Sequence, residues 1–238
     1  MKKMITGVAA VALMMTSAVM AADVDVTVDV ASAYVFRGVT LNDGPVVQPG
    51  LEVALPHGLT VGVWGNLDID DYDGELEEGQ FSEIDIYFDY AIPLDVDGLD
   101  VSVGYTEFTY PGAEGDADRE FGLGFGYDLD FFDVSLGLFY GVDGGIDKDF
   151  YAELGVGTSY DLPEGVVLDL GAAIGYLNPD EGDSGFSAYE LSAGLNYGVL
   201  GASVMYIGQA DSDVLMDVED GGGYDVDVVG MLSLALEF

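Results

Sequence analysis

Apolar and polar residues alternate along most of the chain with a period of two. Between Glu120 and Leu129, one face carries Phe, Leu and Tyr side chains, and the other carries two acidic residues and three glycines. The same alternation covers 188–197 and 232–238. Successive side chains of a β-strand point to opposite faces, so this period predicts strands with one apolar face each. About twelve strands are predicted, near 23–37, 46–56, 58–68, 81–92, 99–110, 119–129, 132–142, 149–161, 165–177, 186–197, 199–209 and 226–238.

The connections between these strands are alternately long and short. The long ones are polar and acidic, and they cover 38–45, 68–79, 111–118, 143–148, 178–185 and 210–225. Outer-membrane barrels combine long external loops with tight periplasmic turns, and their strands need about 9–11 residues. The pattern therefore predicts an all-β fold, a transmembrane antiparallel up-and-down β-barrel that forms one domain over 22–238.

A soluble β-sandwich also alternates in this way, and it is the alternative fold. The aromatic residues favour the barrel, because amphipathic rings gather at both interfaces of a membrane barrel. Such rings lie near the predicted strand ends on the apolar face, at Tyr34, Phe36, Phe88, Tyr90, Tyr127, Tyr140, Tyr160, Tyr176, Tyr189, Tyr197 and Tyr206.

The two ends of the sequence indicate export to the outer membrane. Residues 1–21 have a basic start, an apolar centre and a Val19-Met20-Ala21 cleavage signal, which is typical of a secretory signal peptide. No later stretch approaches the roughly 20 apolar residues of a helical span. We interpret the terminal Phe238 as the residue that outer-membrane assembly machinery recognises. The expected localisation is the bacterial outer membrane, with its lipid as a partner.

The chain is strongly acidic, with 45 Asp and Glu, only 5 Lys and Arg, and a formal net charge of −40. So few basic residues exclude an ordinary nucleic-acid binder, which needs clustered cations for the phosphates. The absence of cysteine excludes disulfides and thiolate metal sites. Because salt screens self-repulsion, we expect the host to be a halophile.

The N-terminal third resembles a known family. The run YVFRGVTLND at 34–43 is followed by PVVQPGL at 45–51, GVWGN at 62–66, SEIDIY at 82–87 and YTEFTYPG at 105–112. Over roughly 28–112 this order is similar to that of the TorF family, a bacterial outer-membrane β-barrel family formerly described as conserved hypothetical proteins. The resemblance implies a porin-like barrel and defines no substrate or active residue.

Candidate catalytic and metal-binding residues are few. His57 is the only imidazole, and it lies in a short predicted turn without a Ser and acid beside it, so we expect no enzyme activity. The acidic stretch 68–79 fails the EF-hand pattern, because taking Gly74 as the sixth position puts Ile69 first, and starting at Asp68 puts Gly79 twelfth. We expect no cofactor, and weak divalent-cation binding by the acidic loops at 68–78 or 211–227 stays an alternative.

The polar face of the strands predicts a wet lumen. Buried carboxylates need partners, and two arginines cannot neutralise so many. The candidate lumen residues are Arg37, Glu52, Asp85, Asp89, Arg119, Glu120, Glu153, Asp169 and Glu190. Arg37 is expected on the first strand, and Arg119 at the mouth of the sixth. The sequence thus predicts a narrow porin-like channel that passes small polar or cationic solutes by diffusion. The alternative is a non-conducting structural or adhesive barrel whose acidic loops bind divalent cations or a partner. Barrels of about eight strands are filled by side chains and those of about sixteen strands conduct, and twelve lies between them.

Overall fold

The computed structural model describes residues 23–72, 78–112 and 116–238, which form a closed β-barrel. All neighbouring strands in it are antiparallel. The barrel strands are β1 (Asp23–Ala31), β4 (Val46–Leu55), β5 (Leu59–Asp68), β6 (Phe81–Ala91), β7 (Leu99–Thr109), β8 (Asp118–Asp128), β9 (Asp133–Asp143), β10 (Phe150–Asp161), β11 (Val166–Asn178), β12 (Gly185–Tyr197), β13 (Leu200–Gln209) and β14 (Val228–Glu237). The predicted all-β barrel of about twelve strands is confirmed.

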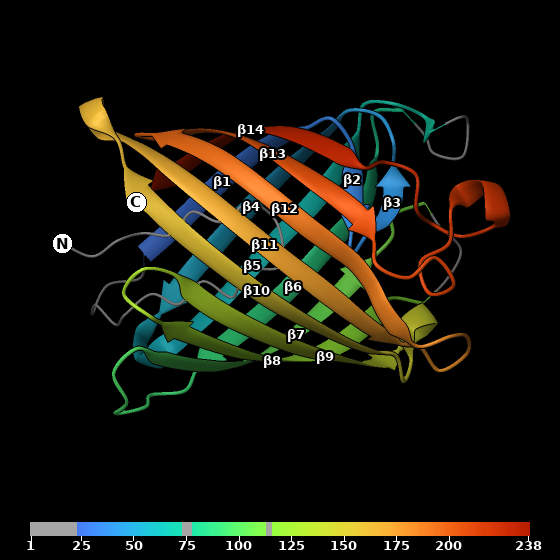
Figure 1. Cartoon of the computed structure of the whole chain (residues 1–238), viewed down its shortest axis with the longest axis horizontal. Coiled ribbons are helices and arrows are strands. Elements are labelled where there is room, and N and C mark those ends of the chain that lie inside the picture. Colours follow the sequence, from blue (N-terminus) through green and yellow to red (C-terminus); the bar gives the residue numbers. More distant parts are fainter. Residues whose placement is uncertain (1–22, 73–77, 113–115) are drawn as a thin grey trace.

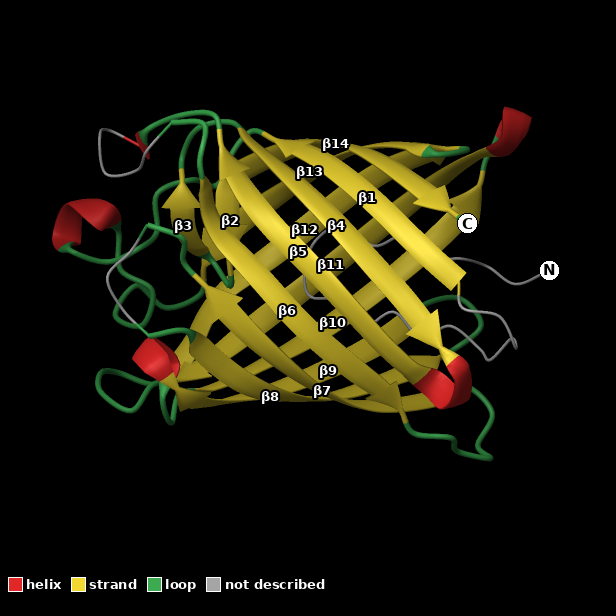
Figure 2. Ribbon diagram, turned by 180° about the vertical axis from the view of Figure 1, so that it is seen from behind, coloured by secondary structure: helices red, strands yellow, loops and turns green. Residues whose placement is uncertain are grey.

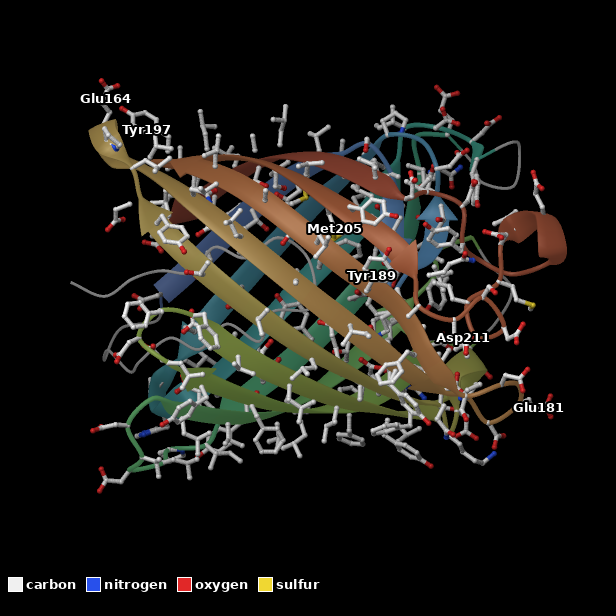
Figure 3. The ribbon with its side chains drawn as sticks, viewed as in Figure 1. Glu164, Glu181, Tyr189, Tyr197, Met205 and Asp211 are labelled. Atoms are coloured by element: carbon white, nitrogen blue, oxygen red, sulfur yellow. The ribbon has the colours of Figure 1, made fainter. Side chains whose placement is uncertain are left out.

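The strands follow one another around the barrel, and β1 closes it by pairing with both β4 and β14. Val28 of β1, for example, lies opposite Pro49 of β4 and Leu234 of β14. The start of β1 and the end of β14 lie at the same end of the barrel as the short turns (Figure 1). We call this the short-turn end and the other the long-loop end. Figure 3 shows Glu164 and Tyr197 at the short-turn end, and Glu181 and Asp211 at the long-loop end.

The outer surface of the barrel is apolar, as the alternation predicts. Ile86, Leu191 and Leu232 are each more than half exposed on it. At the short-turn end, exposed tyrosines from alternate strands form a girdle. This girdle consists of Tyr90, Tyr127, Tyr160 and Tyr197. On the same outer surface, Tyr105 stacks on Phe88, with ring centroids 5.4 Å apart, and contacts Phe121 at 5.2 Å. Rings at the strand ends are typical of a lipid-facing surface.

The remaining elements are short. One is a two-stranded hairpin of β2 (Tyr34–Phe36) and β3 (Val39–Asn42), which does not join the barrel sheet. The others are single 3₁₀ turns at η1 (Pro56–Gly58), η3 (Gly144–Ile146), η4 (Pro163–Gly165) and η5 (Val218–Asp220). In η1, His57 and Gly58 both have positive φ values, 71° and 83°. Glycine adopts this left-handed conformation without steric cost, which suits Gly58 to the turn. No helix of the described residues is long and apolar enough to cross a membrane.

The first predicted strand is wrong in its extent. The prediction runs it from 23 to 37, but β1 ends at Ala31, and the chain then turns inward into the hairpin. Tyr34 is consequently 7% exposed inside the barrel, so it does not belong to an outer aromatic girdle, and Phe36 packs against Phe108 inside as well. The predicted signal peptide at 1–21 lies outside the described residues.

Candidate functional site in the barrel lumen

The hairpin β2–β3 lies within the barrel near its long-loop end (Figure 2). Its two-residue turn consists of Arg37 and Gly38, with φ of 53° and 86°. Two successive positive φ values are typical of the type I′ turn, which suits the twist of a hairpin. The left-handed conformation of Arg37 costs about 1 kcal/mol, so tertiary contacts must hold it there.

One side of the hairpin packs against the wall formed by β1, β4 and β12–β14. The buried apolar residues of this contact come from both ends of the sequence, and Val46 and Ile207 are fully buried. They are Ala31, Ala33, Tyr34, Val46, Ala188, Met205, Ile207, Leu215 and Val229. Gly38 approaches this wall so closely that an added Cβ would lie 2.6 Å from the Cβ of Ala188. The long-loop half of the lumen therefore contains an apolar core.

The tip of the hairpin reaches the opposite wall. The two terminal nitrogens of Arg37 donate to the two carboxylate oxygens of Glu120 in β8, at 3.0 and 2.8 Å. The Arg37 Cζ also lies 4.6 Å from the ring centroid of Phe139 in β9 and 4.5 Å from that of Tyr151 in β10. A third ring, that of Phe36 in the hairpin, lies at 4.7 Å. The hairpin thus crosses the lumen, and a bidentate ion pair inside an aromatic cage fastens it.

A second polar contact joins the hairpin to β6. The Tyr34 hydroxyl donates to Glu83 at 2.9 Å, and its ring contacts that of Trp64 at 5.5 Å. Burial, together with the charges of Glu83 and Asp85, raises the pKa of Tyr34 well above its usual value, so the phenol stays a neutral donor. Among the described residues, Asp85 Oδ1 is buried and has no hydrogen-bond partner.

The base of the hairpin is held by buried amides. The side-chain amides of Asn42 and Asn66 both donate to Asp68 Oδ1, at 2.8 and 2.9 Å, and Gln48 donates to Asn66 at 3.0 Å. The long connection at 210–227 also contacts the hairpin, because the Thr40 hydroxyl accepts from the backbone of Asp225 and Val226. The sequence pattern placed Asp68 where the predicted strand 58–68 meets the acidic connection 68–79, and it did not reveal this network.

Beyond the hairpin, half-buried carboxylates lie on the inward face of the strands. Tyr87 donates to Glu52 at 3.1 Å, and Tyr151 donates to Glu153 at the same distance. Asp169 accepts from Ser159 at 2.5 Å and from Asn196 at 2.6 Å. The structure places on this inward face the candidate residues Glu52, Asp85, Asp89, Glu120, Glu153, Asp169 and Glu190. Of the basic candidates, only Arg37 joins them, through the hairpin.

Arg119 lies at the mouth of its strand, where it was expected, but its side chain does not line the lumen, so that part of the prediction is wrong. It precedes Glu120 on β8, so its side chain points to the opposite face. There it forms ion pairs with Glu107, at 2.8 Å, and with Asp143, at the long-loop rim. The alternation of the sequence already indicated this orientation, because Arg119 and the outward Phe121 are two positions apart and therefore lie on the same face of the strand. Glu83 was missed although it shares the phase of Asp85.

The described residues offer little for chemistry. His57 is exposed in η1 at the short-turn end, away from the hairpin. No group of three or more His, Asp or Glu side chains in the described part of the chain is arranged to hold a metal ion. Residues 73–77 of the acidic stretch at 68–78 lie outside the described residues.

Several solved structures are similar to the chain at low sequence identity. The chain is similar to an outer membrane channel from Pseudomonas putida F1, with a TM-score of 0.57 and 10% identity over 93% of this chain and 97% of that one. For the NanC porin, the TM-score is 0.49 and the identity is 12%, over 89% of this chain and 97% of that one. For LpxR from Salmonella typhimurium, the TM-score is 0.49 and the identity is 9%, over 88% of this chain and 99% of that one. Only the first score exceeds 0.5, and at this identity it shows a shared barrel fold.

The sequence comparisons assign a family. Among curated proteins, no sequence matches the chain. A family profile matches residues 16–217, which cover the predicted strands from the first through the eleventh. That profile describes a bacterial protein of unknown function, Gcw_chp. The chain therefore belongs to the Gcw_chp family of bacterial proteins.

Proposed function

We propose that the protein is an outer-membrane channel of the porin type that passes small polar or cationic solutes by diffusion. The observation that carries this proposal is the division of the barrel into two surfaces. The outer one is apolar and bordered by tyrosines, and the inner one carries half-buried carboxylates. An exposed apolar band with aromatic girdles suits lipid, and a carboxylate-lined path favours cations over anions. The resemblance of roughly 28–112 to the TorF family, which implies a porin-like barrel, supports the same assignment.

The hairpin sets the width of the proposed path. It occupies the lumen between the wall at β12–β14 and the wall at β8–β10, so solutes must pass beside it or displace it. Beneath it, Glu153 interacts electrostatically with Arg37 and with Glu190. We expect this region to be the selective part of the channel.

Planar-bilayer recording tests the channel. In a KCl gradient we expect single-channel steps and a reversal potential that shows cation preference. Glu153→Gln combined with Glu190→Gln should shift that potential toward zero, because two lumen carboxylates lose their charge. The matched control is Glu164→Gln, which removes an exposed charge at the short-turn end and should leave the potential unchanged. No steps in any preparation would contradict a channel, and anion preference would contradict the role of the carboxylates.

A non-conducting structural or adhesive barrel is the second candidate. The observation that favours it is the apolar core in the long-loop half of the lumen, where Val46 and Ile207 are fully buried. Such a barrel would use its acidic loops to bind divalent cations or a partner. Liposome swelling with sugars, amino acids and cations of graded size distinguishes the two. Absence of swelling for all of them, together with loss of surface binding after deletion of 211–225, would favour this candidate.

A further inference from the structure

The wall residues that hold Arg37 belong to the barrel and not to the hairpin. Glu120, Phe139 and Tyr151 come from three neighbouring strands, β8, β9 and β10. They are 83 or more positions from Arg37 in sequence, and their backbones are fixed by the barrel ladder. The barrel therefore positions these three side chains, and the hairpin that carries the guanidinium does not.

The three side chains match the chemistry of a guanidinium group. The carboxylate of Glu120 is oriented for two parallel hydrogen bonds, which a planar guanidinium forms and an ammonium does not. Phe139 and Tyr151 present rings within 5 Å of the guanidinium carbon, a distance at which aromatic rings attract a cation. Tyr151 in turn donates to Glu153, which adds a second carboxylate nearby.

Without Arg37, this wall would carry an uncompensated charge. The Glu120 side chain is only 6% exposed, and its ion-pair partner is Arg37. The neighbouring inward side chains of Asp85 and Glu153 are also acidic, so they supply no cation that could compensate Glu120. A buried carboxylate in such surroundings requires a cation or a proton.

We propose that Glu120, Phe139 and Tyr151 form a guanidinium-binding site of the lumen, which Arg37 fills as a tethered occupant. Solutes with a guanidinium group bind the same site when the hairpin tip leaves it. The inference rests on the proposed function to the extent that solutes enter the lumen. A tethered group has an effective concentration in the millimolar range or above, so free guanidinium compounds compete poorly with it in the wild-type protein.

The test measures binding of methylguanidinium to the purified full-length barrel in detergent micelles by isothermal titration calorimetry. Arg37→Ala vacates the site and should bind methylguanidinium at least tenfold more tightly than the wild type does. It should bind methylammonium at least tenfold more weakly than methylguanidinium, because an ammonium cannot make the paired hydrogen bonds. Arg37→Ala combined with Glu120→Gln should lose the binding.

Two further variants control for folding and for non-specific charge effects. Arg37→Gly removes the same side chain while relieving the positive φ, and it replaces Arg37→Ala if that variant does not fold. Arg119→Ala removes an outward arginine of the rim, leaves the lumen site filled and should gain no binding. The inference is overturned if vacating the site gains no affinity, if methylammonium binds equally well, or if Glu120→Gln has no effect.

A bilayer measurement separates this inference from the proposed channel. Methylguanidinium should block the Arg37→Ala channel over the concentration range in which it binds. If no variant conducts but the binding pattern holds, the channel proposal fails and the site stands. If the channel conducts but the Arg37→Ala variant does not bind methylguanidinium selectively, the binding-site proposal fails and the channel proposal stands.

Discussion

The ion pair between Arg37 and Glu120 should be the strongest single link between the hairpin and the far wall. Its two hydrogen bonds measure 2.8 and 3.0 Å, and the two side chains are 17% and 6% exposed. Removing one partner of a buried pair costs about 3–5 kcal/mol, because the other charge stays buried without compensation. The guanidinium keeps some exposure here, so we expect Arg37→Ala to lower the free energy of unfolding by about 3 kcal/mol.

A double-mutant cycle isolates the pair from the surrounding ring contacts. Glu120→Gln leaves the guanidinium among its three rings and should cost about 2 kcal/mol, the value of hydrogen bonds to a charged group. The double variant Arg37→Ala with Glu120→Gln leaves no charge unpaired. We therefore expect its loss in the free energy of unfolding to be about 1.5 kcal/mol smaller than the sum of the two single losses. An interaction energy of this size is within the range found for residues in contact.

Urea unfolding in lipid vesicles, followed by tryptophan fluorescence, measures these differences. Trp64 is the only tryptophan of the chain, and its ring lies 5.5 Å from Tyr34 in the hairpin, so its emission reports directly on hairpin packing. The matched control is the cycle of Arg119→Ala with Glu107→Gln at the exposed rim, where little coupling is expected. A coupling below about 0.5 kcal/mol for Arg37 and Glu120 would refute the claim that this pair fastens the hairpin.

Three other predictions concern the core, the barrel wall and the charge. Ile207→Ala removes a fully buried side chain beside the hairpin and should cost about 2–5 kcal/mol in the same urea assay, whereas an unchanged midpoint would contradict tight packing there. Gly62→Val should reduce the yield of folded, heat-modifiable barrel on gels, because its Cβ would overlap the Tyr87 ring on the paired strand; Gly230→Ala, which has open space, is the control. The thermal midpoint should rise between low and molar NaCl, because salt screens the repulsion within a chain of net charge −40. An equal midpoint at both salt concentrations would argue against adaptation to high salt.

The alternation of residues determined the barrel and the direction of most side chains. A period of two is a local property, since each strand needs only one face that suits an apolar surface. The pattern therefore predicted the twelve barrel strands within a few residues, except the first, and the inward carboxylates from Glu52 to Glu190. It also held two signals that were misread. Arg119 shares the outward phase of Phe121, and a fifteen-residue first strand exceeds the roughly 11 residues that a crossing strand needs.

Only the tertiary structure decided the path of the chain after Ala31. The segment Tyr34–Asn42 has the same strand-like composition whether it extends β1 or folds back as a hairpin. Its position depends on partners far away in sequence, such as Glu120, which is 83 positions from Arg37, and Val226, which is 186 positions from Thr40. Such contacts leave no local periodicity. The sequence by itself thus determined a barrel with an acidic inner face, and long-range packing decided that one of its two arginines crosses the lumen.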